Sequence, residues 1–265
     1  MPPAAIYQSQ TISPSSHQYS LTQIIGIWAL AAGPMGLLAW VVYPALAPAT
    51  RIRPEIFLWI LMLVGQLWLT VLSLLILYSE EGTLRLSSLR SRIWWQQPRV
   101  SGKNETRKFV WLWIIPLIIA SVVNVAFVGP ILRKVWTSFL PMLAQPSGFS
   151  IESLFSTPIV GNRSMILIGL AVLQLICTYF LGEGLLFRGV LLPKMQRVFG
   201  KLDWPANGLL YAAFHLHKPW AILSAIPGGI LYAEATRDHR CAWLGAIAHS
   251  MEGLFLFFLI LESIA

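Results

Sequence analysis

Residues 55–79 read EIFLWILMLVGQLWLTVLSLLILYS, and their only charged side chain is that of Glu55 at the start. A helix needs about 20 mostly apolar residues to cross the hydrocarbon core of a membrane. Similar stretches recur along the chain, so we expect an all-α integral membrane protein, a bundle of about seven transmembrane helices. The expected spans are residues 21–46, 55–79, 108–132, 164–187, 206–217, 219–236 and 242–264.

The composition of the whole chain agrees with a lipid environment. Of its 265 residues, 56% are hydrophobic and 11% are charged, whereas soluble domains carry about 25% charged residues. The net charge of +8 is better explained by loop residues that orient the protein in the membrane than by nucleic-acid binding. Cys177 and Cys241 lie in or beside apolar stretches and are expected to be packing residues.

Three parts follow from this distribution. Residues 1–20 are rich in Pro, Ser and Gln and are expected to form a flexible tail. Residues 21–163 hold apolar helices and a basic loop at 80–107, which is either an ordinary loop or an amphipathic surface stretch anchored by tryptophans. Residues 164–265 collect most of the ionisable residues. Within them, residues 206–217 are short for a span and end before Pro219, so one helix is expected to be short or broken.

The distribution of Lys and Arg predicts the orientation. Basic residues concentrate in loops that face the cytosol, and the 80–107 loop holds six of them. With this loop inside, the N-terminus is cytosolic, while residues 47–54 and 133–163 lie outside. The count is then 13 basic residues inside and 6 outside. The protein is therefore expected to be multi-pass with a cytosolic N-terminus.

Ionisable residues inside spans are costly and are candidates for function. Glu183 stands between two glycines, near the expected cytosolic end of its span, and Arg188 is expected at the helix end, where the dipole favours a cation. A buried carboxylate can act as a general base, or it can simply pair with a basic residue and tie helices together.

Two further segments carry histidines. Tyr211 and His215 are four residues apart and share a helix face, whereas His217 is expected to point elsewhere. His249, Glu252 and Gly253 also share a face, and a carboxylate can orient a histidine ring. Each histidine could instead form only a structural hydrogen bond between helices.

The order of these segments resembles the CPBP family of intramembrane proteases (CAAX proteases and bacteriocin-processing enzymes). Glu183 to Gly189 resembles the motif Glu-Glu-x-x-x-Arg, Tyr211 to His215 resembles Phe-x-x-x-His, and His249 to Gly253 resembles His-x-x-x-Asn or His-x-x-x-Asp. Two departures stand out. Gly184 occupies the place of the second glutamate, and Gly253 occupies the place of the Asn or Asp.

The resemblance implies a role for each matching residue. Glu183 would be the base, His215 would activate or hold the attacking water, and His249 would donate toward the oxyanion, with Arg188, Tyr211 and Glu252 in support. No residue matches the family's Asn, and an ionised Glu252 accepts hydrogen bonds rather than donating them. Glu183, His215 and His249 could also bind zinc as a His₂Glu set, but they lie on different helices, so the sequence establishes neither zinc nor any other cofactor.

The leading hypothesis is a CPBP-like endopeptidase whose Glu/His site opens toward the cytosol. It would cleave a membrane protein or lipidated peptide, in contact with membrane lipids and without nucleic acid. The alternative is a catalytically impaired, CPBP-like scaffold that binds or protects other membrane proteins, which Gly184 and Gly253 favour. A transporter or proton relay is a third reading, against which the absence of repeat symmetry argues.

Overall fold

The computed structural model describes residues 17–103, 105–150 and 162–263, and these residues form helices and loops without a strand. The all-α prediction is confirmed. The main helices are α1 (Leu21–Leu37), α2 (Tyr43–Leu46), α3 (Pro54–Glu81), α4 (Leu86–Arg92), α5 (Ile114–Val123), α6 (Gly129–Phe139), α7 (Asn162–Gln174), α8 (Gln196–Phe199), α9 (Asp203–Phe214), α10 (Ile222–His239) and α11 (Ala242–Ser263).

Five helical stretches are long and apolar enough to cross a membrane. They are Leu21–Ala49, Pro54–Glu81, Lys108–Phe139, Met165–Lys194 and Ala242–Glu262. The two remaining expected spans, 206–217 and 219–236, correspond to α9 and α10, which do not meet these criteria. With 12 residues, α9 is about 18 Å long, shorter than a hydrocarbon core of about 30 Å.

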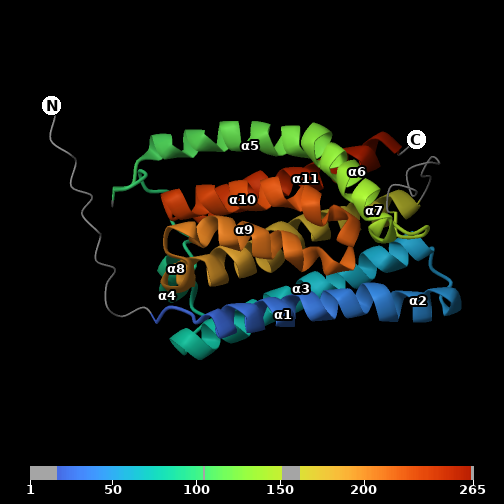
Figure 1. Cartoon of the computed structure of the whole chain (residues 1–265), viewed down its shortest axis with the longest axis horizontal. Helices are drawn as coiled ribbons and strands as arrows, with labels where there is room; N and C mark the ends of the chain where they lie inside the picture. Colours follow the sequence, from blue (N-terminus) through green and yellow to red (C-terminus); the bar gives the residue numbers. More distant parts are fainter. Residues whose placement is uncertain (1–16, 104, 151–161, 264–265) are drawn as a thin grey trace.

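The long helices run side by side in one bundle (Figure 1). The α1/α3 pair and the α5/α6 stretch form its two sides, while α9, α10 and α11 lie between them. The expected break near Pro219 is confirmed, because two short 3₁₀ turns, His215–His217 and Pro219–Ala221, separate α9 from α10. Irregular backbone at membrane depth is tolerated where it lines a cavity, and this turn does so.

The fourth span differs from its prediction in length and in winding. It continues from α7 through two π-helical segments, Leu175–Gly182 and Gly184–Leu191, and ends at Lys194 instead of residue 187. Glu183 therefore lies 11 residues before the end, about 16 Å along the axis, and not near the end of the span. Arg188 is likewise inside the helix and fully buried, which corrects its predicted place at the helix end.

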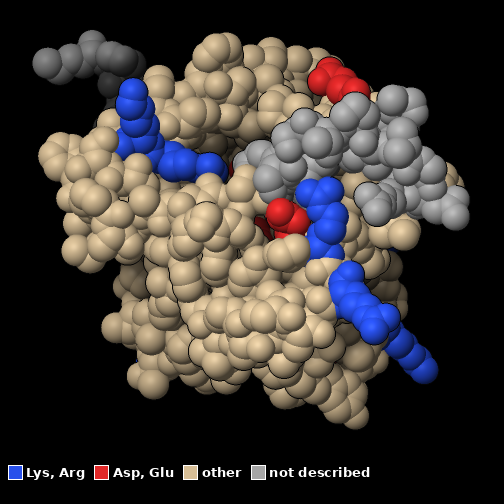
Figure 2. Space-filling model, turned by 90° about the vertical axis from the view of Figure 1, so that its right-hand side faces the viewer, with Lys and Arg blue, Asp and Glu red and all other residues tan. Residues whose placement is uncertain are grey.

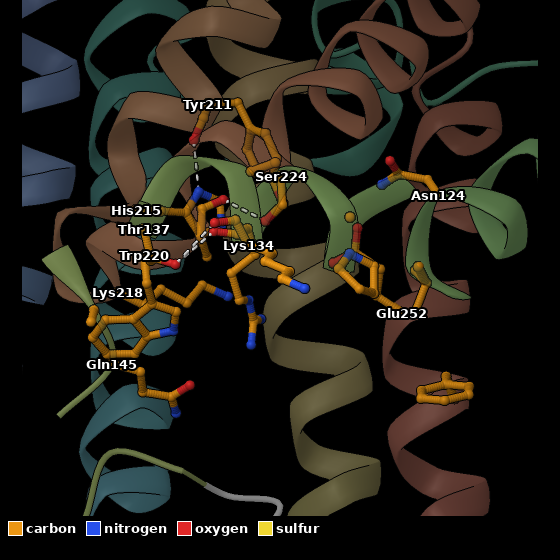
Figure 3. Close-up of a pocket in the computed structure, with 18 residues that line it drawn as sticks. Asn124, Lys134, Thr137, Gln145, Tyr211, His215, Lys218, Trp220, Ser224 and Glu252 are labelled. Carbon is orange, nitrogen blue, oxygen red and sulfur yellow. Dashed lines mark hydrogen bonds between the residues drawn. The ribbon is translucent and has the colours of Figure 1, made fainter. Parts of the chain in front are cut away.

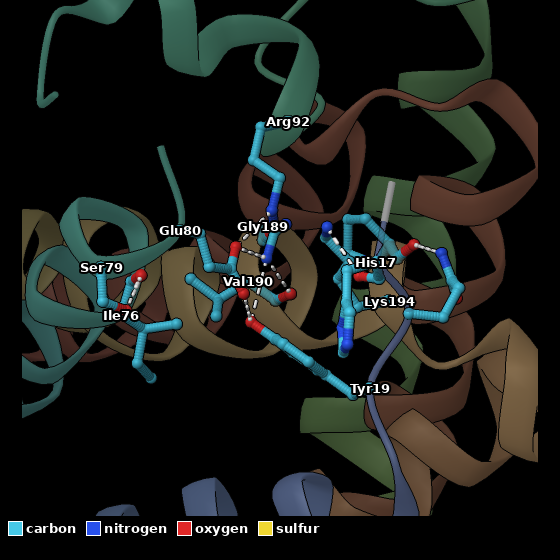
Figure 4. Close-up of polar contacts among 11 residues, drawn as sticks. His17, Tyr19, Ile76, Ser79, Glu80, Arg92, Gly189, Val190 and Lys194 are labelled. Carbon is cyan, nitrogen blue, oxygen red and sulfur yellow. Dashed lines mark hydrogen bonds and ion pairs between the residues drawn. The ribbon is translucent and has the colours of Figure 1, made fainter. Parts of the chain in front are cut away.

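A polar cluster contacts the C-terminal end of this span (Figure 4). The Arg92 guanidinium donates to the carbonyls of Gly189 and Val190, at 3.1 Å each, and also pairs with Glu80 at 2.8 Å. The Tyr19 hydroxyl donates to Glu80 at 2.5 Å. The two bonds from Arg92 to the Gly189 and Val190 carbonyls satisfy backbone oxygens near the end of the π-helical segment. The cluster therefore stabilises the span that carries Glu183.

This cluster also corrects the prediction for the N-terminal tail. Tyr19 is buried, and its backbone N–H donates to the carbonyl of Lys194 at 3.0 Å. Residues 17–20 are thus packed against the bundle, and residues 1–16 lie outside the described part. The 80–107 loop is also packed, because Leu89 and Ile93 are buried and Trp95 stacks on Trp243 with ring centroids 5.0 Å apart.

Candidate active site

Glu183 occupies the junction between the two π-helical segments and is buried. The amide nitrogen of Gln66, on α3, donates to its Oε1 at 2.7 Å. A Cβ at position 182 would stand 2.5 Å from the Gln66 Oε1, so only a glycine there lets the two helices approach closely enough for this bond. Gln66 was missed in the sequence reading, although an amide in the middle of the apolar stretch 55–79 was a usable signal.

His249, on α11, lies between two carboxylates. Its Nε2 is 3.6 Å from Glu183 Oε2, 3.9 Å from Glu252 Oε2 and 2.7 Å from the Tyr211 hydroxyl. Tyr232, on α10, stacks on the His249 ring at 4.9 Å and donates its hydroxyl to Glu252 Oε1 at 3.1 Å. The predicted common face of His249 and Glu252 is confirmed, and the site gains a second carboxylate from α11.

His215 ends α9 and points its ring into the same cavity. Its Nδ1 lies 3.0 Å from the carbonyl oxygen of Tyr211. Because a carbonyl only accepts hydrogen bonds, Nδ1 must carry the proton, which leaves the neutral ring with an acceptor lone pair on Nε2. The T-shaped contact between the Tyr211 and His215 rings, at 4.9 Å, agrees with their predicted common face.

The prediction that His217 points elsewhere is wrong. Its ring stacks on that of His215 with centroids 5.5 Å apart and an interplanar angle of 27°, and it lines the same cavity. The prediction assumed α-helical spacing, whereas residues 215–217 form a 3₁₀ turn that changes the direction of each side chain.

Arg188 is a buried cation beside this group. Its guanidinium carbon lies 4.2 Å from the centre of the Tyr211 ring, and its three nitrogens have no hydrogen-bond partner within the described part of the chain. A π-helix joins residues five apart by backbone hydrogen bonds, so Glu183 and Arg188 lie nearly above one another along the axis. The π-helical winding thus places the Arg188 guanidinium over the ring of Tyr211, whose hydroxyl contacts His249.

Tyr179 explains both departures from the family motifs. A Cβ at position 253 would overlap the Tyr179 ring and would stand 2.9 Å from Leu175. A Cβ at position 184 would overlap the backbone carbonyl of Tyr179. The Tyr179 ring also packs edge-on against His249, with centroids 4.6 Å apart. The Tyr179 ring therefore fills the space that a larger residue at position 253 would need, whereas the backbone of the π-helical turn fills the space at position 184.

A cavity of about 210 Å³ lies within this group of residues. The cavity brings Glu183, His215 and His249 together with Gln66, Tyr179 and Glu252. A second cavity, of about 670 Å³, shares Tyr211, His215 and Glu252 with the first and extends to α6 (Figure 3). The predicted convergence of the acid and the two histidines is present, while their catalytic roles stay predictions.

The position of the cavities bears on the predicted orientation. They are lined by Leu58 and Trp59 from the start of α3, by Arg133 from α6 and by Phe149, all at the end of the bundle opposite the basic 80–107 loop (Figure 1). Figure 2 looks onto this end and shows basic side chains on either side of a recessed acidic one. The two predictions therefore conflict: if the 133–163 segment lies outside, the cavities cannot open toward the cytosol.

The geometry does not fit a bound metal ion. Among the described residues, no group of three or more His, Cys, Asp or Glu side chains is arranged so that it could hold one. Glu183 and His249 are close, with His249 Nε2 3.6 Å from Glu183 Oε2, but two ligands do not make the three-residue set of a catalytic zinc site. We therefore derive no step through zinc.

Comparison with known proteins identifies the C-terminal part. Residues 163–255 match the family model described as type II CAAX prenyl endopeptidase Rce1-like. This part of the chain is similar to the Rce1-like family. The match includes all three motifs, and it confirms the CAAX-protease family predicted from them. The comparison with curated proteins found no match, and the comparison with solved structures found none.

Proposed function

We propose that this protein is an intramembrane endopeptidase of the CAAX-protease type, with Glu183, His215 and His249 as its catalytic residues. The observation that carries the proposal is the convergence of these three side chains, from separate helices, in one buried cavity. Burying an acid and two histidines in a membrane protein is costly in free energy, and a catalytic function would account for that cost. The Rce1-like match over the same residues supports this reading.

The chemistry would be hydrolysis of a peptide bond by an activated water. Glu183 takes one proton from the water, and the Nε2 lone pair of His215 accepts a hydrogen bond from the other. The water oxygen attacks the carbonyl carbon, which leaves a negative charge on the carbonyl oxygen. In place of the 2.7 Å bond that it makes with the Tyr211 hydroxyl, His249 would donate its Nε2–H to that oxygen. The carbonyl then re-forms, the carbon–nitrogen bond breaks, and the proton held by Glu183 passes to the leaving amine.

Gly184 and Gly253 favour a second function, a scaffold that binds membrane proteins without cleaving them. The family's Asn would supply a hydrogen-bond donor for the oxyanion, and losing one such donor typically costs 10²–10³ in rate. In this chain the space is taken by the Tyr179 ring. The enzyme remains the better proposal, because Gln66 and Tyr211 hold Glu183 and His249 in defined positions.

The orientation of the protein determines the side of the membrane on which the cavity opens. With the 80–107 loop in the cytosol, as the distribution of Lys and Arg predicts, the cavity opens on the opposite face. Substrates would then present their cleavage site on the non-cytosolic side. Labelling of a single cysteine placed at Arg133, from each side of sealed vesicles, measures this directly.

The test of the enzyme compares membrane-protein fragments from cells that make the wild-type protein or its Glu183→Gln variant. The variant keeps the side-chain shape but removes the base, so cleavage should fall by about 10²–10⁴. Glu234→Gln is the matched control, because Glu234 is an exposed carboxylate on the neighbouring α10. Identical fragments from all three proteins, with partner binding retained in Glu183→Gln, would refute the enzyme and support the scaffold.

A further inference from the structure

The larger cavity next to His215 has a basic wall. Arg133 and Lys134 from α6 and Lys218 from the turn between α9 and α10 all line it, and Figure 3 shows Lys134 and Lys218 extending into the same space. None of the three has a salt bridge to a carboxylate among the residues the structure describes. Like charges that converge without an acidic partner repel each other, and a bound anion removes this repulsion.

The carboxylate in this cavity does not neutralise the group. Glu252 lines the same wall, and its carboxylate offsets only one of the three positive charges. Three cations and one carboxylate leave a positive excess. Gln145 also lines the cavity. Its amide nitrogen donates one hydrogen to the Phe149 carbonyl and keeps a second that can be donated to an oxyanion.

Depth in the membrane indicates the kind of anion. Arg133 and Lys134 lie in the last seven residues of the span Lys108–Phe139, within about 10 Å of its end. This is the depth of lipid headgroups. On the same stretch, Phe127, Ile131 and Phe139 expose 66%, 63% and 80% of their surface, which gives acyl chains an apolar surface beside the cations.

From these observations we propose that Arg133, Lys134 and Lys218 form a binding site for the phosphate of an anionic membrane lipid at the mouth of the cavity. Arg presents a planar fork to phosphate oxygens, and the two lysines add point charges. The proposal is independent of whether the protein cleaves peptides.

The test titrates the purified full chain, in a neutral detergent, with phosphatidylglycerol, phosphatidylcholine and inorganic phosphate. Native mass spectrometry measures the bound fraction of each. Each basic residue near an anionic headgroup contributes about a five-fold change in affinity. The triple variant Arg133→Gln, Lys134→Gln, Lys218→Gln should therefore bind phosphatidylglycerol roughly 100-fold more weakly, with phosphatidylcholine binding unchanged.

A matched control removes the same charge at the opposite end of the bundle. Arg85, Lys103 and Arg197 are exposed there, and their joint change to Gln should leave phosphatidylglycerol binding at the wild-type level. Equal loss in both triple variants, or no preference for phosphatidylglycerol in the wild type, would overturn the site. Inorganic phosphate that binds as tightly as the lipid would overturn the lipid assignment. Should the triple variant not fold, Lys218→Gln alone is expected to show about a five-fold loss, and an unchanged affinity would count against the site.

Discussion

Adding one methyl group at Gly253 measures how tightly Tyr179 fills the site. In Gly253→Ala, the new Cβ overlaps the Tyr179 ring and stands 2.9 Å from Leu175. Both neighbours are packed side chains in the middle of the bundle, so they cannot move without disturbing the contact between Tyr179 and His249. We expect the substitution to lower the free energy of unfolding.

The magnitude follows from comparison with a glycine that has room. A Cβ added at Gly169, on α7, would meet no atom within 4 Å, so Gly169→Ala should gain the helix propensity of alanine, up to about 1 kcal/mol. Gly253→Ala gains the same propensity but also overpacks the core, which costs about 1–3 kcal/mol. The difference between the two variants isolates the overpacking and should be about 1–3 kcal/mol.

The assay is unfolding in mixed micelles of a mild detergent and dodecyl sulfate, followed by circular dichroism. The same pair of substitutions is then made in a Tyr179→Ala background, where the ring is absent. Substitutions in contact are not additive, so the difference between Gly253→Ala and Gly169→Ala should shrink to within about 0.5 kcal/mol. A difference that persists without the ring, or that is absent from the start, would refute the assignment of Tyr179 as the filling residue.

Two further predictions concern the other end of the bundle. Arg92→Gln removes the donors to the Gly189 and Val190 carbonyls and should lower the free energy of unfolding by about 1.5–3 kcal/mol. Arg85→Gln, at an exposed position before the same helix, should lower it by less than about 0.5 kcal/mol. Equal losses in the two variants would contradict a stabilising role of the bonds from Arg92 to these carbonyls. Burial raises the pKa of the Cys241 thiol to about 11, so the thiol favours the folded state below its unfolded pKa of about 8.5 and this contribution is lost as the pH rises toward 11. The unfolding free energy of the wild type should therefore fall more steeply than that of Cys241→Ala between pH 8.5 and 11. The same pH dependence in both proteins would contradict the raised pKa of Cys241.

Sequence reasoning reached the fold class and the three motif residues because both leave strong signals. Apolar stretches of span length are visible in any window of the chain, as in residues 55–79. Glu183, His215 and His249 stand out because ionisable residues are rare in such stretches. Their order then pointed to a family that the match over residues 163–255 bears out.

The details that failed depend on backbone winding. Arg188 was placed at a helix end because the span was expected to end at residue 187, whereas it continues to Lys194. His217 was turned away from His215 because that prediction assumed 3.6 residues per turn. The structure winds the first region as a π-helix and the second as a 3₁₀ turn. Winding of this kind results from packing between helices, so the local sequence does not reveal it. Tyr179 was missed for a similar reason, since its importance lies in the space opposite Gly184 and Gly253.

The π-helical winding also sets a limit on changes of length. A deletion of one residue between Glu183 and Arg188 would return the segment toward α-helical spacing and turn everything beyond it by about 100°. Arg188 would leave the Tyr211 ring, and Arg92 would face different carbonyls. Insertions or deletions should thus be rejected between residues 175 and 191. A deletion scan of the chain would map the span that carries Glu183 by its intolerance alone, without any knowledge of the substrate.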